Sequence, residues 1–224
     1  METRTGYKMG DQELTLCGPE LKPGDQAPDF TITKTDLSPL TLKDLGNKVK
    51  AIAAVPSVDT KVCELETIRF NEEAEKLGDD VVVLTVSVDL PFALERFCAA
   101  EGIKNAIVAS DYQNRDFAKK YGVLIDGLFL LNRSIFVLDQ DNNVVYAAYN
   151  EQNTAHPDYD AALQAAKDLL EAANHFIKKK RPWAMPTVFL FLALLDFSGI
   201  SLFCPGPWPP HTQQQQKKPP RAES

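Results

Sequence analysis

One stretch limits the possible folds of this chain more than any other, because it joins a buried strand to a helix through a turn. Residues 49–55 are short and largely apolar and end at Pro56, which is typical of a buried strand. Apolar residues then recur at helical spacing, at Leu65, Ile68, Ala74 and Leu77. Gly78 is a natural helix end. We therefore expect a strand, a turn after Pro56 and a helix that stops at Gly78.

Cys63 falls in the first turn of that helix. Thr60 is placed to cap the helix, with its hydroxyl accepting a hydrogen bond from an amide two or three residues further on. The unpaired amides and the dipole of a helix N-terminus favour negative charge, so this position stabilises a thiolate. Cys63 is therefore a candidate nucleophile. A buried cysteine that only fills core space is the alternative interpretation of the same stretch.

Composition excludes several classes of function. The 224 residues, 44% of them hydrophobic, fit one domain with an appended segment. A formal net charge of -7 argues against a nucleic-acid partner. The cysteines, at 17, 63, 98 and 204, form no Cys-x-x-Cys pair, and with 3 histidines no metal site is expected. The N-terminal region contains no apolar stretch of the kind found in secretory signals. We therefore expect the protein in a reducing cytoplasm, where a disulfide would be catalytic rather than structural.

The rest of the chain predicts alternating strands and helices. Strands are expected at 31–33, 81–89, 107–109, 133–138 and 144–149. Helical segments are expected at 41–46, 92–100, from Asp111 or Asn114 to 121, and from 157 to 173. Residues 1–18 are expected to form a small hairpin, and 122–125 to lead into a loop. Strand, helix, strand in this order implies a parallel pair. The predicted fold is α/β, a thioredoxin-like three-layer sandwich with a central mixed β-sheet and an N-terminal hairpin.

Several motifs, in this order, resemble the peroxiredoxins and in particular their thiol peroxidase subfamily. The resemblance covers residues 21–173. Each motif is weak alone, whereas their order and spacing together are specific. They are Gly24-Asp25-Gln26-Ala27-Pro28-Asp29-Phe30, Pro56-Ser57-Val58-Asp59-Thr60-Lys61-Val62-Cys63, Arg69-Phe70-Asn71-Glu72-Glu73-Ala74, Leu90-Pro91-Phe92-Ala93-Leu94, Arg96-Phe97-Cys98, Tyr121-Gly122-Val123 and Arg133 with Phe136-Val137-Leu138-Asp139.

The resemblance implies that Cys63 is the peroxidatic residue of a hydroperoxide reductase. Its thiolate would attack one peroxide oxygen and become a sulfenic acid. Thr60 would orient peroxide and thiolate, and Arg133 would donate to the departing oxygen. Pro56 would shield the sulfur from water. Without the resemblance, Thr60 is only a helix cap, Arg133 a solvated charge and Pro56 the end of a strand.

By the same resemblance, Cys98 is the resolving residue, which would condense with the sulfenic acid to an intrachain Cys63–Cys98 disulfide. The two cysteines are 98 − 63 = 35 residues apart, on successive helices. Packed helix axes lie about 8–10 Å apart, and a disulfide needs Cα atoms within about 7 Å. The first turns of both helices are therefore expected to loosen. A thioredoxin-like dithiol would reduce the disulfide, with no metal, flavin or nucleotide cofactor. Cys17 is expected to be structural.

The expected peroxiredoxin domain is 1–177, and 178–224 lies outside the resemblance. A basic run at 178–181 precedes an apolar stretch at 183–204. A membrane anchor, an adventitious extension and a partner-binding helix are the competing interpretations. Asp196 near the centre leaves membrane insertion only marginally favourable, so we favour a poorly ordered or adventitious tail, with Cys204 not catalytic.

The sequence thus predicts a cytoplasmic, thioredoxin-dependent thiol peroxidase that reduces hydrogen peroxide and organic hydroperoxides. Its relatives suggest a homodimer, and membrane association is not favoured. The alternative is a non-enzymatic, peroxide-sensing redox switch that acts on a protein or membrane partner through the apolar tail.

Overall fold

A computed structural model describes residues 2–180 of the chain; the expected tail beyond Lys180 lies outside the described residues. The strands form a seven-stranded sheet of order β10-β9-β5-β6-β7-β3-β4 and a three-stranded sheet of order β1-β2-β8. The larger sheet contains β3 (Thr31–Lys34), β4 (Pro39–Thr41), β5 (Val49–Ala54), β6 (Val81–Ser87), β7 (Ile107–Ser110), β9 (Ser134–Leu138) and β10 (Val144–Tyr149). The smaller sheet contains β1 (Thr3–Met9), β2 (Gln12–Cys17) and β8 (Leu124–Ile125).

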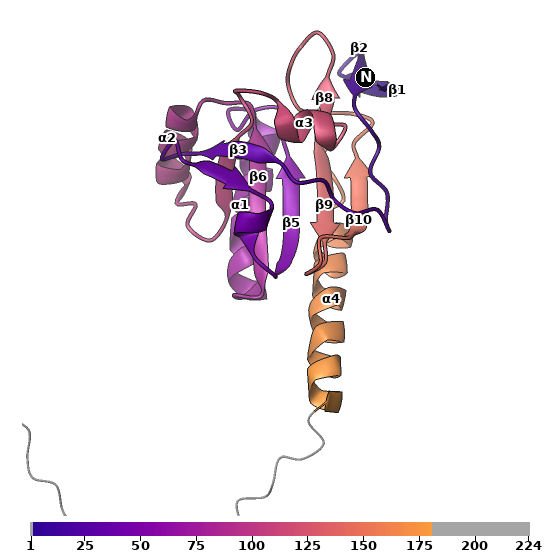
Figure 1. Cartoon of the computed structure of the whole chain (residues 1–224). Coiled ribbons are helices and arrows are strands. Elements are labelled where there is room, and N and C mark those ends of the chain that lie inside the picture. Colours follow the sequence, from indigo (N-terminus) through magenta and orange to yellow (C-terminus); the bar gives the residue numbers. More distant parts are fainter. Residues whose placement is uncertain (1, 181–224) are drawn as a thin grey trace, which may run out of the picture. The chain divides into compact units, whose positions relative to one another are not determined.

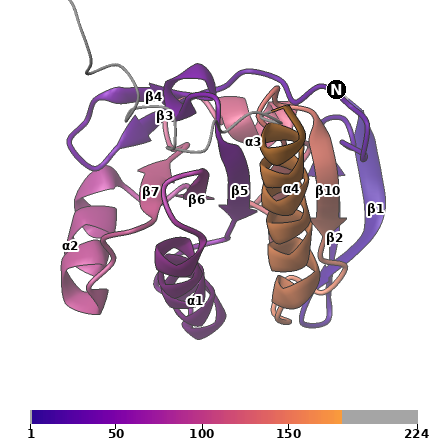
Figure 2. The same cartoon turned by 90° about the horizontal axis from the view of Figure 1, so that it is seen from below.

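Helices complete three layers around the larger sheet (Figures 1 and 2). One face carries α1 (Lys61–Leu77), α2 (Pro91–Glu101) and α4 (Tyr159–Lys180), and the other carries α3 (Asp116–Lys120) and the 3₁₀ turn η1 (Lys43–Leu45). Strand β5 is parallel to β6 and antiparallel to β9, so the sheet is mixed. The expected thioredoxin-like three-layer α/β sandwich is confirmed.

The central strands are largely apolar because both of their faces are covered. In β5, Val49, Ala51 and Ala53 belong to the cluster under α1 and α4. The alternate residues Ile52 and Ala54 belong to the cluster on the opposite face. This period of two fixes the register of the strand. After Ala54 the chain enters the turn that precedes α1.

The buried face of α1 differs from the expected one. Leu65, predicted on the apolar face, is 47% exposed. The buried residues of the helix are Cys63, Glu66, Thr67, Phe70 and Ala74. The first two turns of the helix therefore bury the polar side chains of Glu66 and Thr67, and Glu66 is buried because it pairs with Arg133. The predicted helix end at Gly78 is confirmed, since its N–H bonds to the Ala74 carbonyl in a backbone with φ 74°.

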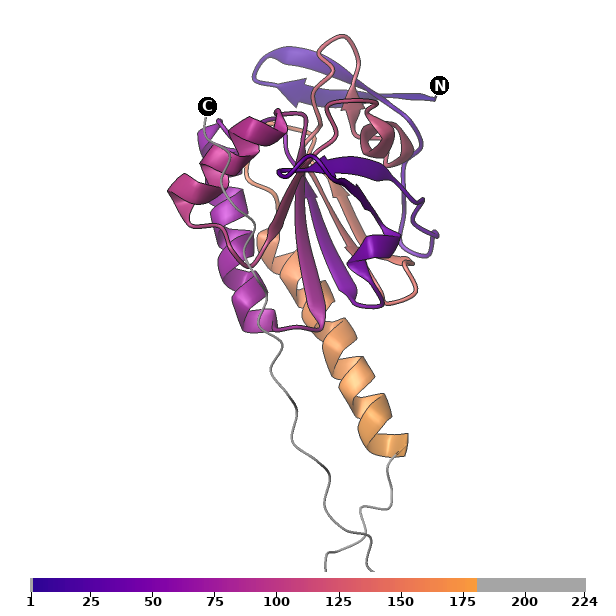
Figure 3. The ribbon, with the colours of Figure 1, turned by 60° about the vertical axis from the view of Figure 1, so that its left-hand side comes forward.

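The expected N-terminal hairpin is formed by β1 and β2. It is extended by β8, because Leu16 and Cys17 pair with Ile125 and Leu124, where the sequence suggested only a lead into a loop. Arg4 attaches the hairpin to the core, since its guanidinium lies 4.4 Å from the centre of the Tyr149 ring. Figure 3 shows the hairpin near one end of the large sheet and α4 extending past the other.

Two helix boundaries differ from the expectation. Helix α3 begins at Asp116 rather than near Asp111, but the Asp111 carboxylate still accepts hydrogen bonds from the Phe117 and Ala118 amides, at 3.3 and 2.8 Å. Helix α4 continues to Lys180, past the domain end expected at 177. Within residues 2–180, none of the helices combines the length and apolar character needed to span a bilayer.

Candidate active site

The site is built around the turn that connects β5 to α1. Pro56 is buried two residues after the end of the strand. The helix begins after Thr60, whose carbonyl accepts the Glu64 N–H at 2.9 Å. This first helical bond places Cys63 in the opening turn of α1, as predicted, with its side chain fully buried. The local fold thus positions a sulfur at the helix end that favours an anion.

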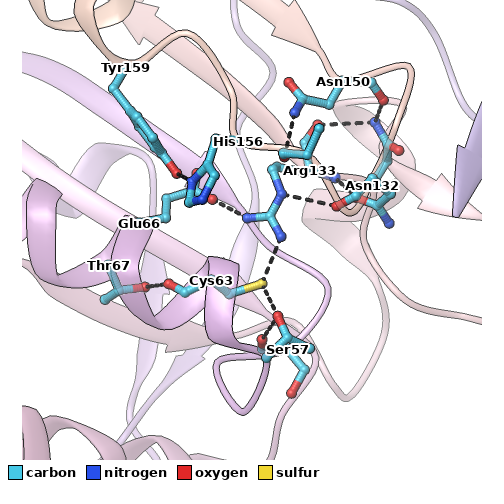
Figure 4. Close-up of polar contacts among 12 residues, drawn as sticks. Ser57, Cys63, Glu66, Thr67, Asn132, Arg133, Asn150, His156 and Tyr159 are labelled. Atoms are coloured by element: carbon cyan, nitrogen blue, oxygen red, sulfur yellow. Dashed lines mark hydrogen bonds and ion pairs between the residues drawn. The ribbon is translucent and has the colours of Figure 1, made fainter. Parts of the chain in front are cut away.

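Two donors reach the Cys63 sulfur from different parts of the chain (Figure 4). The Thr60 hydroxyl lies 2.7 Å from Sγ, and Nη2 of Arg133 lies 3.1 Å from it. The structure therefore brings together three of the predicted site residues. Thr60 is the N-cap residue of α1, as predicted, but the capping hydrogen bond expected of its side chain is not formed. Its hydroxyl instead lies within reach of the sulfur and of the Ser57 carbonyl, at 3.2 Å.

Arg133 is not a solvated charge, because only 1% of its surface is exposed. Its backbone N–H and its Nε both donate to Asn153, at 2.6 and 3.1 Å, and Nη1 pairs with the Glu66 carboxylate. Burial opposes the guanidinium charge, but the neighbouring Glu66 and Cys63 outweigh burial, so the pKa of Arg133 lies above its ordinary value. Every nitrogen of the guanidinium thus has an assigned partner, and the Nη2 donor is fixed on the sulfur.

Glu66 is a site residue that the sequence reasoning missed. It lies one helical turn after Cys63, is fully buried and pairs with Arg133. Burial raises the pKa of Glu66 to about 7, against the opposing effect of Arg133. Its spacing of three residues from Cys63 was the available signal, because i and i+3 share a helix face.

Tyr159 and His156 border this group at the start of α4. The Tyr159 hydroxyl lies 2.8 Å from Nδ1 of His156, and the Arg69 guanidinium lies 4.7 Å from the centre of the Tyr159 ring. Burial raises the pKa of Tyr159, and the nearby Glu66 acts in the same direction. Tyr159 therefore remains a neutral phenol beside the buried ion pair.

Cys98 lies in a different kind of environment. It is half-buried and packs against the apolar cluster that also contains Cys63. Its carbonyl accepts the N–H of Gly102 and of Ile103, so it lies in the last turn of α2. Helix α2 begins seven residues earlier, at Pro91, so Cys98 lies outside the first turn that was expected to loosen. Burial raises the pKa of the Cys98 thiol.

Cys63 and Cys98 are both free thiols in this structure. Cys17, also free, is half-buried in β2 and packs against the main core. Among residues 2–180, no group of three or more histidine, cysteine, aspartate or glutamate side chains is arranged to hold a metal ion. The chemistry that the described residues present is therefore that of a buried sulfur with a guanidinium and a hydroxyl as donors.

Comparison with known proteins identifies the family. The family model described as Redoxin matches residues 22–163. A thiol peroxidase of Halalkalibacterium halodurans is 51% identical over 157 residues, covering 70% of this chain and 94% of the relative. A thiol peroxidase of Streptococcus gordonii is 50% identical over 156 residues, covering 70% and 95%.

Solved structures agree with the sequence comparison. A peroxiredoxin-like protein from Aquifex aeolicus superposes with a TM-score of 0.69 at 41% identity, covering 74% of this chain and 97% of that one. The thiol peroxidase from Chromobacterium violaceum gives a TM-score of 0.66 at 25% identity, covering 76% and 97%. Fold and sequence thus define a thioredoxin-like redoxin. The chain belongs to the redoxin family and, within it, to the thiol peroxidases.

Proposed function

We propose that this protein is a thioredoxin-dependent thiol peroxidase that reduces hydrogen peroxide and organic hydroperoxides. The observation that supports this most directly is the Cys63 sulfur, 2.7 Å from the Thr60 hydroxyl and 3.1 Å from Nη2 of Arg133. Both donors face the atom that must attack, and a bound peroxide would share them. A peroxide-sensing switch without turnover is not favoured, because the thiol peroxidase relatives are similar over nearly their whole length.

The first step oxidises Cys63. The thiolate attacks one peroxide oxygen, the O–O bond breaks, and the second oxygen leaves with a proton as water or an alcohol. Charge builds on the departing oxygen, so the donors act most strongly in the transition state. Arg133 suits this role because its guanidinium is permanently charged and already held in place by Glu66 and Asn153. Pro56, buried beside the turn, would limit the access of water.

The second step joins the two cysteines. The Cys98 thiol attacks the sulfenic sulfur of Cys63, a disulfide forms, and the sulfenic oxygen leaves as water. A dithiol of the thioredoxin class then reduces the disulfide and becomes oxidised itself. Cys98 suits the resolving role because it packs against the same apolar cluster as Cys63, on the neighbouring helix. The cycle needs no metal, flavin or nucleotide.

We also propose that the protein acts in the cytoplasm as a homodimer. The cycle requires Cys63 and Cys98 to return to thiols, which a reducing compartment supports. Large apolar side chains that are exposed in the single chain support self-association. They include Leu65, Leu90, Phe92, Leu128 and Phe129. Analytical ultracentrifugation at several concentrations tests the dimer.

A coupled assay tests the enzymatic proposal. Hydrogen peroxide is added to the full chain with thioredoxin, thioredoxin reductase and NADPH, and NADPH oxidation is followed. We expect sustained turnover by the wild type and by Cys17→Ser, and none above background by Cys63→Ser. Turnover by Cys63→Ser near the wild-type rate would move the chemistry to another residue, while oxidation of the wild type without turnover would favour the sensor.

A further inference from the structure

The carboxylate of Asp89 binds the turn that leads to Cys63. Asp89 lies between the end of β6 and the start of α2. Its Oδ1 accepts the Ser57 hydroxyl at 2.8 Å, and its Oδ2 accepts the Val58 amide at 2.8 Å. The Ser87 hydroxyl also donates to Oδ2, at 2.8 Å, and orients the carboxylate. One acidic side chain thus connects the peroxidatic turn to the segment that starts the resolving helix.

The sheet order shows why this connection matters. Cys63 directs its sulfur toward Arg133, which directly precedes β9. Cys98 belongs to α2, which packs against β7. Strands β9 and β7 lie on opposite sides of the β5–β6 pair. The sulfur that reacts with peroxide therefore faces away from the side that carries Cys98, and it must leave Arg133 before a disulfide closes.

A second contact limits where this movement occurs. Oδ1 of Asn71, in the middle of α1, accepts three backbone N–H groups of the loop after α2. The donors are Lys104, Asn105 and Ala106, at 2.9, 2.8 and 3.2 Å. Asn71 thereby fixes the middle of α1 to the loop that follows the resolving helix. The segment that can open without breaking this contact is the turn and the first helical residues, where Asp89 is the charged anchor.

We propose that Asp89 is a positioning residue that holds the Ser57–Cys63 turn in the arrangement that reacts with peroxide and thereby limits the rate at which the turn opens for disulfide closure. This inference rests on the proposed function. Asp89 touches neither substrate nor sulfur; it acts through Ser57 and Val58. Breaking these bonds leaves the reacting groups intact but makes the open turn easier to reach.

The test separates the two chemical steps in Asp89→Asn. Sulfenic acid formation is followed by rapid mixing with hydrogen peroxide and trapping, and Cys63–Cys98 closure by quenched samples and peptide mass. The amide side chain cannot satisfy both donors, so we expect closure to be faster by about tenfold, as for the loss of one hydrogen bond to a charged group. Sulfenic acid formation should be slower or unchanged. Ser57→Ala, which loses one of the bonds, should speed closure by less and should not speed sulfenic acid formation.

Asp139→Asn is the matched control, because Asp139 also accepts several hydrogen bonds in a turn, from Asp141 and Asn143, but after β9 and at the other end of that strand from Arg133. We expect it to change neither rate. Closure that is slower or unchanged in Asp89→Asn would overturn the proposal. Hydrogen exchange provides an independent measure: residues 57–64 should exchange faster in Asp89→Asn, with 104–106 unchanged, and equal exchange would also overturn it. Absence of a Cys63–Cys98 disulfide in the wild type would refute the proposed cycle, and the exchange result would still decide whether Asp89 holds the turn.

Discussion

The surroundings of Cys63 and Cys98 differ although both residues belong to one apolar cluster. Cys63 is fully buried, yet its sulfur has a hydroxyl and a guanidinium as neighbours. Cys98 is more exposed, but its pKa is raised by burial, with only a backbone hydrogen bond opposing this. Burial alone therefore does not decide thiol reactivity. The difference comes from donors that other segments deliver to one sulfur and not to the other.

This contrast agrees with a division of labour. A peroxidatic cysteine must be an anion before peroxide arrives, whereas a resolving thiol needs to react only with a sulfenic acid that is already formed. A neutral Cys98 is also a poor competitor for peroxide.

Replacing Cys98 by serine removes one half of the contrast. Cys98→Ser should consume about one equivalent of peroxide per chain and then stop, because its sulfenic acid has no resolving partner and thioredoxin cannot act on a disulfide that does not form. Peroxide consumption and dimedone labelling of Cys63 measure this. A Cys17–Cys63 disulfide, mapped by peptide mass in the wild type, would contradict the assignment.

Replacing Arg133 by lysine weakens the donor set of Cys63 while keeping the positive charge. Lysine lacks the planar fork that reaches Glu66, Asn153 and the sulfur together. We expect sulfenic acid formation to slow by about 10- to 100-fold, the effect of one lost hydrogen bond to a charged group. Stopped-flow mixing with hydrogen peroxide measures the rate. Closure of the disulfide after oxidation should not slow, and an unchanged oxidation rate would show that Arg133 is only structural.

The sequence predicted the parts of this site that follow from local pattern. The strand, turn and helix around Cys63 carry their own signals, and so does the hairpin of β9 and β10, which consists of two apolar segments about a polar turn. Glu66 was missed because a charged residue on an amphipathic helix is usually solvated, and only the distant Arg133 makes its burial favourable. The exposure of Leu65 was missed for the same reason, since the ion pair places the helix face that carries Glu66, rather than the face that carries Leu65, against the core.

Other features depend on contacts that no local pattern reveals. Strand β8 has two residues, too few to show a period, and it exists because β2 pairs with it. The hydroxyl of Thr60 could satisfy either an amide or the sulfur, and the sequence cannot choose between them. The position of Arg133 at the start of a strand predicts a solvated charge. The residue is instead held in the interior by Asn153, which lies 20 residues further along the chain.

The Glu66–Arg133 pair should leave a signature in the pH dependence of stability. The pKa of Glu66 is about 7 when folded and 4.5 ordinarily. Between these values the folded state holds more proton than the unfolded state, so the free energy of unfolding contributed by Glu66 falls as the pH rises toward 7 and is then constant. The loss is of the order of 3 kcal/mol. Urea unfolding of wild type and Glu66→Gln from pH 5 to 8 measures it as their difference. A difference that stays constant from pH 5 to 8 would contradict this, because it would show that Glu66 is ionised throughout that range in the folded state as well.

The smallest expected effect concerns Cys98. Because burial raises the pKa of its thiol, the rate at which iodoacetamide alkylates Cys98 should keep rising to a higher pH than for an ordinary thiol. Peptide mass spectrometry of the Cys63→Ser variant follows this single residue. The same protein unfolded in urea is the control and should level off at lower pH. Identical pH profiles for the folded and the unfolded protein would show that the environment of Cys98 does not raise the pKa of its thiol.

The position of Arg133 also determines when the site comes into existence during protein synthesis. Arg133 follows Cys63 by 70 residues, and strand β9, which it precedes, pairs with β5 on one side and with β10 on the other. While the ribosome is still making the residues between them, the nascent Cys63 has its helix but lacks its guanidinium. Domains generally fold as units once their chain is available. A newly made chain therefore gains its full reactivity toward peroxide only when the segment that brings Arg133, and Asn153 behind it, has emerged and docked.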